Sequence, residues 1–334
     1  MGVESGRSVD DAAAADPDPA EVDPDGPDAQ SRELLARLEA ACGPPLHTLS
    51  PAQARADNAA TTRWLVGPPP EVTSIADRRI MGPGGPLTLR VYRAHQDGAP
   101  GPVLVWFHGG GWVVGDLETH DVLCRHLALA AGCTIVSVDY RLAPEHPFPA
   151  AIDDARAATD WVLDHAEELG ADAARVVVGG DSAGGNLAAV VARHARAAHL
   201  AGQVLVYPVT DHSLDWPSVG RHGDVHHFTT QAMRWYWDRY VPDPEERDDP
   251  DASPLRAGDL TGVAPAVVLV AACDLLHDQG VAYAGRLREA GVRVRLLTAK
   301  GQLHGYLRWT AVTDASTVAI DAIGQRLRGL ARST

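Results

Sequence analysis

The sequence predicts an α/β fold, with a mostly parallel sheet, helices on both faces and a small helical cap. From Val103 onward, short apolar and β-branched runs alternate with stretches of helical spacing. Such continuously apolar strands are typical of a parallel sheet that is covered on both faces. A second observation is the interruption at residues 210–265, which is too long for an ordinary connection. We therefore expect this insertion to cap the end of the sheet where open α/β sheets bind ligands.

Helical spacing before the core predicts further cap elements at residues 31–70. Ser31 is expected to cap a first helix, and a second is expected to begin near Ser50 and Pro51. The remaining segments make up the expected α/β core: residues 71–209 and 266–334.

Composition limits the classes of function. The chain has 334 residues, of which 45% are hydrophobic types, enough for one large core and an accessory layer. The net charge of -15 disfavours nucleic-acid partners, because phosphate contacts need clustered Lys and Arg. Residues 1–30 contain nine acidic groups against Arg7 alone, in a stretch rich in Ala and Pro. This composition predicts a disordered acidic tail.

The chain shows no export or membrane signal. No basic segment followed by an apolar run opens it, and no window is apolar for long enough to cross a bilayer. We therefore expect a cytoplasmic protein without a membrane span. No cysteine pair has CxxC or metal-site spacing, which predicts reduced, buried thiols. The cysteines concerned are Cys42, Cys124, Cys133 and Cys273.

The strongest local signal is the pentapeptide at residues 180–184, Gly-Asp-Ser-Ala-Gly, between an expected strand at Val176–Val178 and an expected helix. A serine flanked by glycines in this context fits a nucleophile elbow, a sharp turn that lifts a hydroxyl clear of the sheet. We therefore identify Ser182 as a candidate nucleophile. A glycine-rich turn with an ordinary helix-capping serine is the alternative.

A second glycine motif, His108-Gly109-Gly110-Gly111, follows the expected strand at Val103–Phe107. Glycines allow backbone N–H groups to approach a substrate oxygen closely, as an oxyanion hole requires. We expect the N–H groups of Gly109, Gly110 and Ala183 to form that site.

A serine nucleophile needs a base and an orienting carboxylate, and after such an elbow the chain order is Ser, acid, His. Asp274 follows an expected strand at Ala266–Ala271, and His304 follows another at Val292–Leu297. We expect these two residues to complete a catalytic triad. Asp278 is the rival acid, although its place in the first turn of a helix favours dipole stabilisation.

Three motifs together resemble the hormone-sensitive-lipase family of α/β-hydrolase esterases, in its bacterial branch. They are residues 108–112 (His-Gly-Gly-Gly-Trp), 139–150 (Asp-Tyr-Arg-Leu-Ala-Pro-Glu-His-Pro-Phe-Pro-Ala) and 180–187 (Gly-Asp-Ser-Ala-Gly-Gly-Asn-Leu). The resemblance implies an α/β-hydrolase fold with an eight-stranded sheet and a helical cap. It also implies a Ser182–His304–Asp274 triad, activity on short- to medium-chain acyl esters, no cofactor, and the possibility of a homodimer.

The pocket walls are less well defined by the sequence. The chain departs from the family pattern beside the acid and the histidine, where Leu275, Gln302 and Tyr306 stand. The candidate pocket residues are Trp112, Asp181, Leu275 and Tyr306. Of the cap aromatics Trp235, Tyr236 and Trp237, we expect most to pack in the cap and one or two to face the pocket.

Two further groups of residues are interpreted as structural and not as catalytic or metal-binding. We expect Arg141 and Glu145 to pair beneath the site. A metal site is conceivable at the cap residues His222, Asp224, His226 and His227, but their spacing matches no familiar closed site. A polar cap loop is the preferred interpretation, so no metal is expected.

These observations favour a carboxylesterase that acts on a small-molecule ester through an acyl-enzyme. The same residues are compatible with a deacetylase, an amidase or a lactonase. A non-catalytic receptor for a small ligand is a further alternative, which the presence of His304 disfavours.

Overall fold

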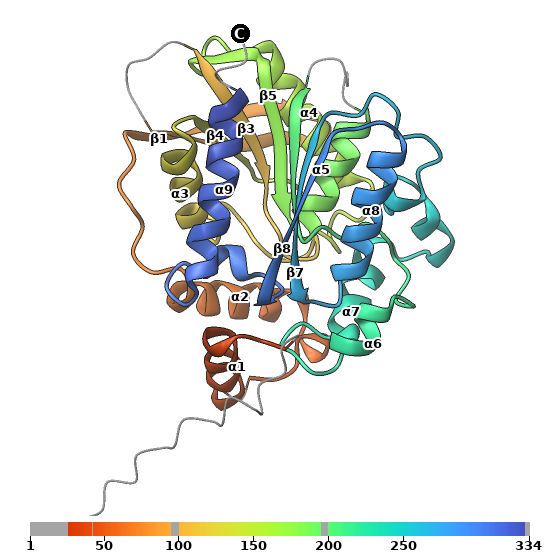
Figure 1. Ribbon diagram of the computed structural model, residues 1–334. Coiled ribbons are helices and arrows are strands. Elements are labelled where there is room, and N and C mark those ends of the chain that lie inside the picture. Colours follow the sequence, from red (N-terminus) through yellow and green to blue (C-terminus); the bar gives the residue numbers. More distant parts are fainter. Residues whose placement is uncertain (1–25, 42, 95–99, 195–199, 331–334) are drawn as a thin grey trace, which may run out of the picture.

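The computed structural model describes residues 26–41, 43–94, 100–194 and 200–330 (Figure 1). Its centre is an eight-stranded sheet in the order β1-β2-β4-β3-β5-β6-β7-β8. The strands are β1 (Ser74–Gly82), β2 (Gly85–Arg93), β3 (Gly101–Phe107), β4 (Thr134–Val138), β5 (Ala171–Asp181), β6 (Leu200–Val206), β7 (Ala266–Cys273) and β8 (Val294–Leu303).

The strand directions confirm the predicted fold class. β2 runs antiparallel to both β1 and β4, and every other neighbouring pair in the sheet is parallel. The central strands are apolar along their whole length because both faces are covered: all five residues of β4 are buried. The register aligns Phe107 of β3 with Gly180 of β5, which brings the two glycine motifs side by side.

Helices cover both faces of the sheet (Figure 1). One face is covered by α3 (Asp121–Ala131) and α9 (Asp314–Leu330), which pack against each other. The other is covered by α4 (Ala150–Asp164), α5 (Ala183–His194) and α8 (His277–Glu289). The buried apolar side chains accordingly form two large clusters.

Four helices gather at the end of the sheet where β5, β7 and β8 finish (Figure 1). They are α1 (Ala29–Ala40), α2 (Pro51–Leu65), α6 (Pro217–His222) and α7 (Thr230–Tyr240). The short 3₁₀ helices are η2 (Leu46–Thr48), η4 (Pro244–Asp248), η5 (Pro254–Arg256) and η6 (Tyr306–Arg308). Helix α2 begins where predicted, because Ser50 and Gln53 form a reciprocal capping box.

Helix α1 begins earlier than predicted. Asp28, not Ser31, caps it, and its carboxylate accepts the N–H of Ser31 at 2.8 Å. The side chain of Gln302 also donates to Asp28, which ties the start of α1 to the end of β8. Ala29 and Gln30 are therefore helical, although the acidic tail was expected to include them. Residues 1–25 of that expected tail lie outside the described residues.

The segment at residues 139–150 is held by partners outside itself, so the predicted pairing of Arg141 with Glu145 is wrong. Arg141 Nε lies 2.8 Å from the carboxylate of Asp154 in α4. Glu145 pairs instead with Arg55 of α2, at 2.6 Å. The two side chains point to different helices, so the segment joins the core to the cap.

Cys124, Cys133 and Cys273 are buried, and Cys42 lies outside the described residues. In the part of the chain that the structure describes, no helix is both long and apolar enough to span a membrane.

Candidate active site

Ser182 occupies a strained turn between β5 and α5. Its φ of 57° lies in the left-handed region, which residues other than glycine rarely adopt. The flanking glycines are required by close backbone approach: a Cβ on Gly184 would lie 1.9 Å from the carbonyl oxygen of Phe107, and one on Gly180 would lie 2.4 Å from the backbone of Gly184. This geometry matches the nucleophile elbow expected from the sequence.

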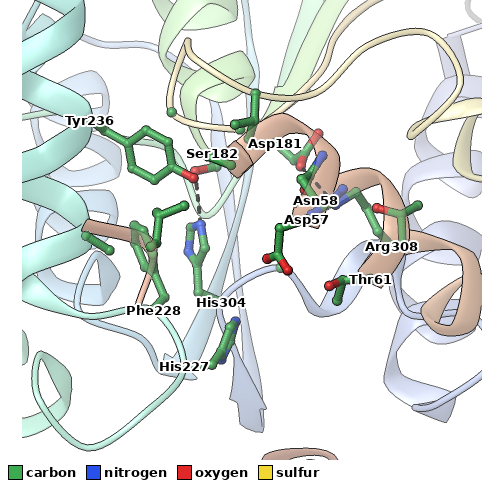
Figure 2. A pocket seen from close by; sticks show the side chains of 18 of the residues that line it. Asp57, Asn58, Thr61, Asp181, Ser182, His227, Phe228, Tyr236, His304 and Arg308 are labelled. Atoms are coloured by element: carbon green, nitrogen blue, oxygen red, sulfur yellow. Dashed lines mark hydrogen bonds and ion pairs between the residues drawn. The ribbon is translucent and has the colours of Figure 1, made fainter. Parts of the chain in front are cut away.

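Three predicted side chains meet at this turn, and Figure 2 shows two of them, Ser182 and His304. His304 follows directly after β8, and its Nε2 lies 2.9 Å from Ser182 Oγ. Its Nδ1 lies 2.7 Å from the carboxylate of Asp274, which is fully buried just beyond β7. The imidazole is thus placed to accept the hydroxyl proton while the carboxylate orients its other nitrogen.

The rival acid, Asp278, binds other partners. The carboxylate of Asp278 accepts the N–H of Ser218 at 2.8 Å and pairs with Arg221 at 3.1 Å. Burial opposes its ionisation, but hydrogen bonds from His277 and Ser218 and the charge of Arg221 lower its pKa below the ordinary value. Asp278 therefore links α6 of the cap to α8.

The glycine motif places its N–H groups differently from the expectation. The N–H of Gly109 donates to Asp181 Oδ1 at 3.1 Å, so this predicted oxyanion donor already has an acceptor. The next two glycines line the pocket, with φ of 123° for Gly110 and 57° for Gly111. A Cβ on Gly110 would lie 2.2 Å from the carbonyl oxygen of Val114, which explains why glycine is needed there.

Asp181 lines the pocket, as predicted, but its carboxylate faces a buried polar cluster. His120 Nε2 lies 3.3 Å from Asp181 Oδ1, and both side chains are almost fully buried. Burial opposes ionisation of Asp181, but His120 and Arg308 outweigh it and lower the pKa of the carboxyl. Burial also lowers the pKa of His120.

The pocket above Ser182 is a cavity of about 200 Å³. Its apolar wall includes Met233 and Tyr236 of α7 and Phe228, whose ring stacks on His304 at 4.2 Å. Figure 2 shows a polar wall on the side of the Ser182–His304 pair that faces away from Tyr236 and Phe228. This wall was not predicted from the sequence. That wall is formed by Asp57, Asn58, Thr61 and Arg308.

Three predicted wall residues do not line this pocket. Trp112 is fully buried and stacks on Tyr240 at 4.1 Å, because the turn at this residue (φ 59°) directs it into the cap core. Leu275 is packed in the main core beside the acid. Tyr306 is buried against Tyr207, with ring centroids 5.7 Å apart.

The cap aromatics and histidines divide as follows. Of Trp235, Tyr236 and Trp237, only Tyr236 lines the pocket, while the two tryptophans are buried in the cap. His222 and His226 stack on each other at 5.4 Å, whereas His227 lines the pocket. Within the described residues, no group of three or more His, Cys, Asp or Glu side chains is arranged to hold a metal ion.

Comparison with known proteins identifies the family. Residues 104–308 match the model of a family with the alpha/beta hydrolase fold. Ethyl acetate hydrolase from Pseudomonas putida is 40% identical over 85% of this chain and 92% of its own length. Carboxylic ester hydrolase LipN from Mycobacterium tuberculosis is 43% identical over 78% of this chain and 72% of its own length.

Among solved structures, a thermostable esterase from Pseudomonas putida superimposes with a TM-score of 0.88. It is 38% identical in sequence, and the match covers 92% of this chain and 99% of that one. This chain therefore belongs to the hormone-sensitive-lipase family of α/β-hydrolase esterases.

Proposed function

We propose that the protein is a carboxylesterase that hydrolyses short- to medium-chain acyl esters through an acyl-enzyme on Ser182. The observation that carries this proposal is the continuous contact from Asp274 through His304 to Ser182 Oγ. His304 takes the hydroxyl proton as Ser182 attacks the ester carbonyl, and then returns it to the departing alcohol. Water activated by His304 releases the acid. The neighbouring Asp274 stabilises the imidazolium in both steps.

The tetrahedral oxyanion is stabilised by backbone N–H groups. Gly110 and Gly111 line the pocket, and Ala183 is the first residue of α5, so its N–H has no helical acceptor. Gly109 is not among these donors, because its N–H donates to Asp181. One such donor is worth on the order of 3 kcal/mol in the barrier.

The small cavity supports the limit on acyl length. Its volume of about 200 Å³ lies below the roughly 300–1,000 Å³ that is typical of pockets for drug-sized ligands. Long acyl chains therefore extend beyond the enclosed part of the pocket, and we expect kcat/KM to be highest for acetyl to hexanoyl esters.

A fluorophosphonate probe tests the nucleophile. We expect the wild-type protein to be labelled, and Ser182→Ala to abolish both labelling and hydrolysis of p-nitrophenyl butyrate. Ser137→Ala is the matched control, because Ser137 is also buried but lies in β4. Labelling that persists in Ser182→Ala would disprove the assignment. Faster cleavage of a butyryl anilide than of the matching ester would identify an amidase instead.

A further inference from the structure

The polar wall of the pocket has no structural task of its own. Asp57, Asn58 and Thr61 are spaced along one face of α2, and all three line the cavity. Asp57 is exposed, Asn58 and Thr61 are half-buried, and within the described residues none of these side chains makes a hydrogen bond or an ion pair with the protein. Elsewhere in the cap, polar side chains near the core do have partners, as Arg55 shows by bonding Val113, Ala143 and Glu145.

Arg308, the last residue of η6, completes the polar wall. Its side chain is only 18% exposed, and its Nε has no hydrogen-bond partner in the described part of the chain. The nearest acid is Asp181, at 3.9 Å, which is too long for a hydrogen bond. A buried guanidinium N–H without an acceptor is costly, unless a ligand or water supplies the missing oxygen.

The charges of the wall select the class of ligand. Arg308 already faces Asp181, and Asp57 adds a second carboxylate, so an anionic group meets net repulsion. A cationic group is attracted by Asp57, but in this wall it is then placed beside the like charge of Arg308. A neutral group that both donates and accepts hydrogen bonds suits all four side chains, because the wall combines donors of Arg, acceptors of Asp, and both kinds in Asn and Thr. Hydroxyl groups have this property.

We propose that the ester substrate carries an uncharged, hydroxylated group that binds this wall, while its apolar part contacts Phe228, Met233 and Tyr236. The assignment rests on the proposed esterase function and specifies its substrate class. The hydroxyls belong either to the alcohol or to the acyl part of the ester, and the two are separated by experiment.

Two pairs of esters with equal numbers of heavy atoms test the proposal. In the first, 2,3-dihydroxypropyl butyrate is compared with pentyl butyrate; in the second, butyl 2,3-dihydroxypropanoate is compared with butyl pentanoate. An apolar pocket favours the hydrocarbon member by roughly tenfold, because it buries two more methylenes. We expect the opposite in one pair, with kcat/KM at least about tenfold higher for the dihydroxy ester.

The preference for the dihydroxy ester should depend on the side chains of the polar wall. Asn58→Leu combined with Thr61→Val should lower the preference for the dihydroxy ester by roughly tenfold or more, mainly by raising KM for that ester. Because each comparison uses the same ester, its intrinsic reactivity cancels. Arg63→Leu is the control, since Arg63 is exposed on the same helix and does not line the pocket. Thermal unfolding checks that each variant is folded.

The outcomes are distinct. Preference for the dihydroxy ester in either pair, lost in the double variant, supports the assignment and shows which side of the ester bears the hydroxyls. Preference for the hydrocarbon in both pairs, or a preference that the double variant retains, overturns it and leaves the esterase function intact. Failure of wild-type protein to cleave any of the four esters contradicts the esterase function itself.

Discussion

The elbow around Ser182 and the polar wall on α2 line the same pocket but are built differently. At the elbow the backbones are so close that a single Cβ on Gly184 collides with Phe107, and the nearby carboxylate of Asp181 is tied to Gly109 and His120. On the wall, Asn58 and Thr61 are half-buried and have no protein partner in the described residues. The core therefore holds the catalytic groups in place before a substrate binds. The polar groups that we propose to select the ester have no partner until a ligand binds.

The cap that carries the wall is attached at a few points. Arg55 bonds two core carbonyl oxygens, those of Val113 and Ala143, and also pairs with Glu145. Trp235 of α7 donates its indole N–H to the carbonyl of Leu49 at 3.2 Å, which joins the two distant parts of the cap. Changes in the core should therefore act mainly on kcat, while changes at the cap should act on KM or on stability.

The two acids beyond β7 provide the sharpest test of this contrast. Asp274→Asn should lower kcat by on the order of 10³ to 10⁴, because the amide no longer holds the required tautomer of His304. Asp278→Asn should lower it less than about tenfold, because Asp278 supports α6 instead. Steady-state kinetics on p-nitrophenyl butyrate measure both. If Asp278→Asn caused the larger loss, the assignment of the acid would be wrong.

The core site was predictable because its constraints are local. A glycine-flanked serine between a strand and a helix has few structural uses, and the order of Ser182, Asp274 and His304 follows the chain. The choice among adjacent glycines was not predictable. Which of the N–H groups of Gly109, Gly110 and Gly111 faces the pocket depends on backbone angles, and three identical residues carry no information about those angles.

The walls were not predictable because they depend on how the cap is placed over the sheet. Trp112, Leu275 and Tyr306 are neighbours of site residues in sequence, yet each side chain points into a core. Asn58 and Thr61 are far from every motif. Their spacing on α2 marks one helix face, but nothing in the sequence states that this face lies above Ser182.

An intermediate loss of kcat is expected from substitution of Asp181, whose carboxylate holds the glycine loop. Asp181→Ala removes the nearer acceptor of the Gly109 N–H, Asp181 Oδ1 at 3.1 Å, and leaves only His120 Nε2 at 3.3 Å. Losing a hydrogen bond to a charged group costs about 1.5–3 kcal/mol. We expect kcat to fall roughly 10- to 100-fold with little change in KM, because Gly110 and Gly111 lose their alignment. Asp181→Asn, which keeps an acceptor oxygen, should lose less. Equal losses in the two variants, or a change confined to KM, would contradict this role.

The smallest effect is expected at the cap attachment, where Arg55 meets Glu145. Its hydrogen bond to Arg55 lowers the pKa of Glu145 to about 2. A carboxyl whose pKa is lower in the folded state stabilises that state above its unfolded pKa, about 4.3, and loses this contribution as the pH falls towards 2. Because the Glu145 side chain is 55% exposed, we expect only about 0.5 kcal/mol.

Glu145→Gln should therefore reduce the free energy of unfolding slightly at pH 6, and the difference from wild type should vanish by about pH 2. Urea unfolding across this range measures it, and added salt should shrink it because the pair is exposed. Glu167→Gln is the control, since Glu167 is exposed and has no ion pair in the described residues. A difference that stays constant with pH would show that Glu145 supports α2 by packing instead of charge. The kcat at pH 7 should be nearly unchanged, because this contact holds the cap and not the reacting groups.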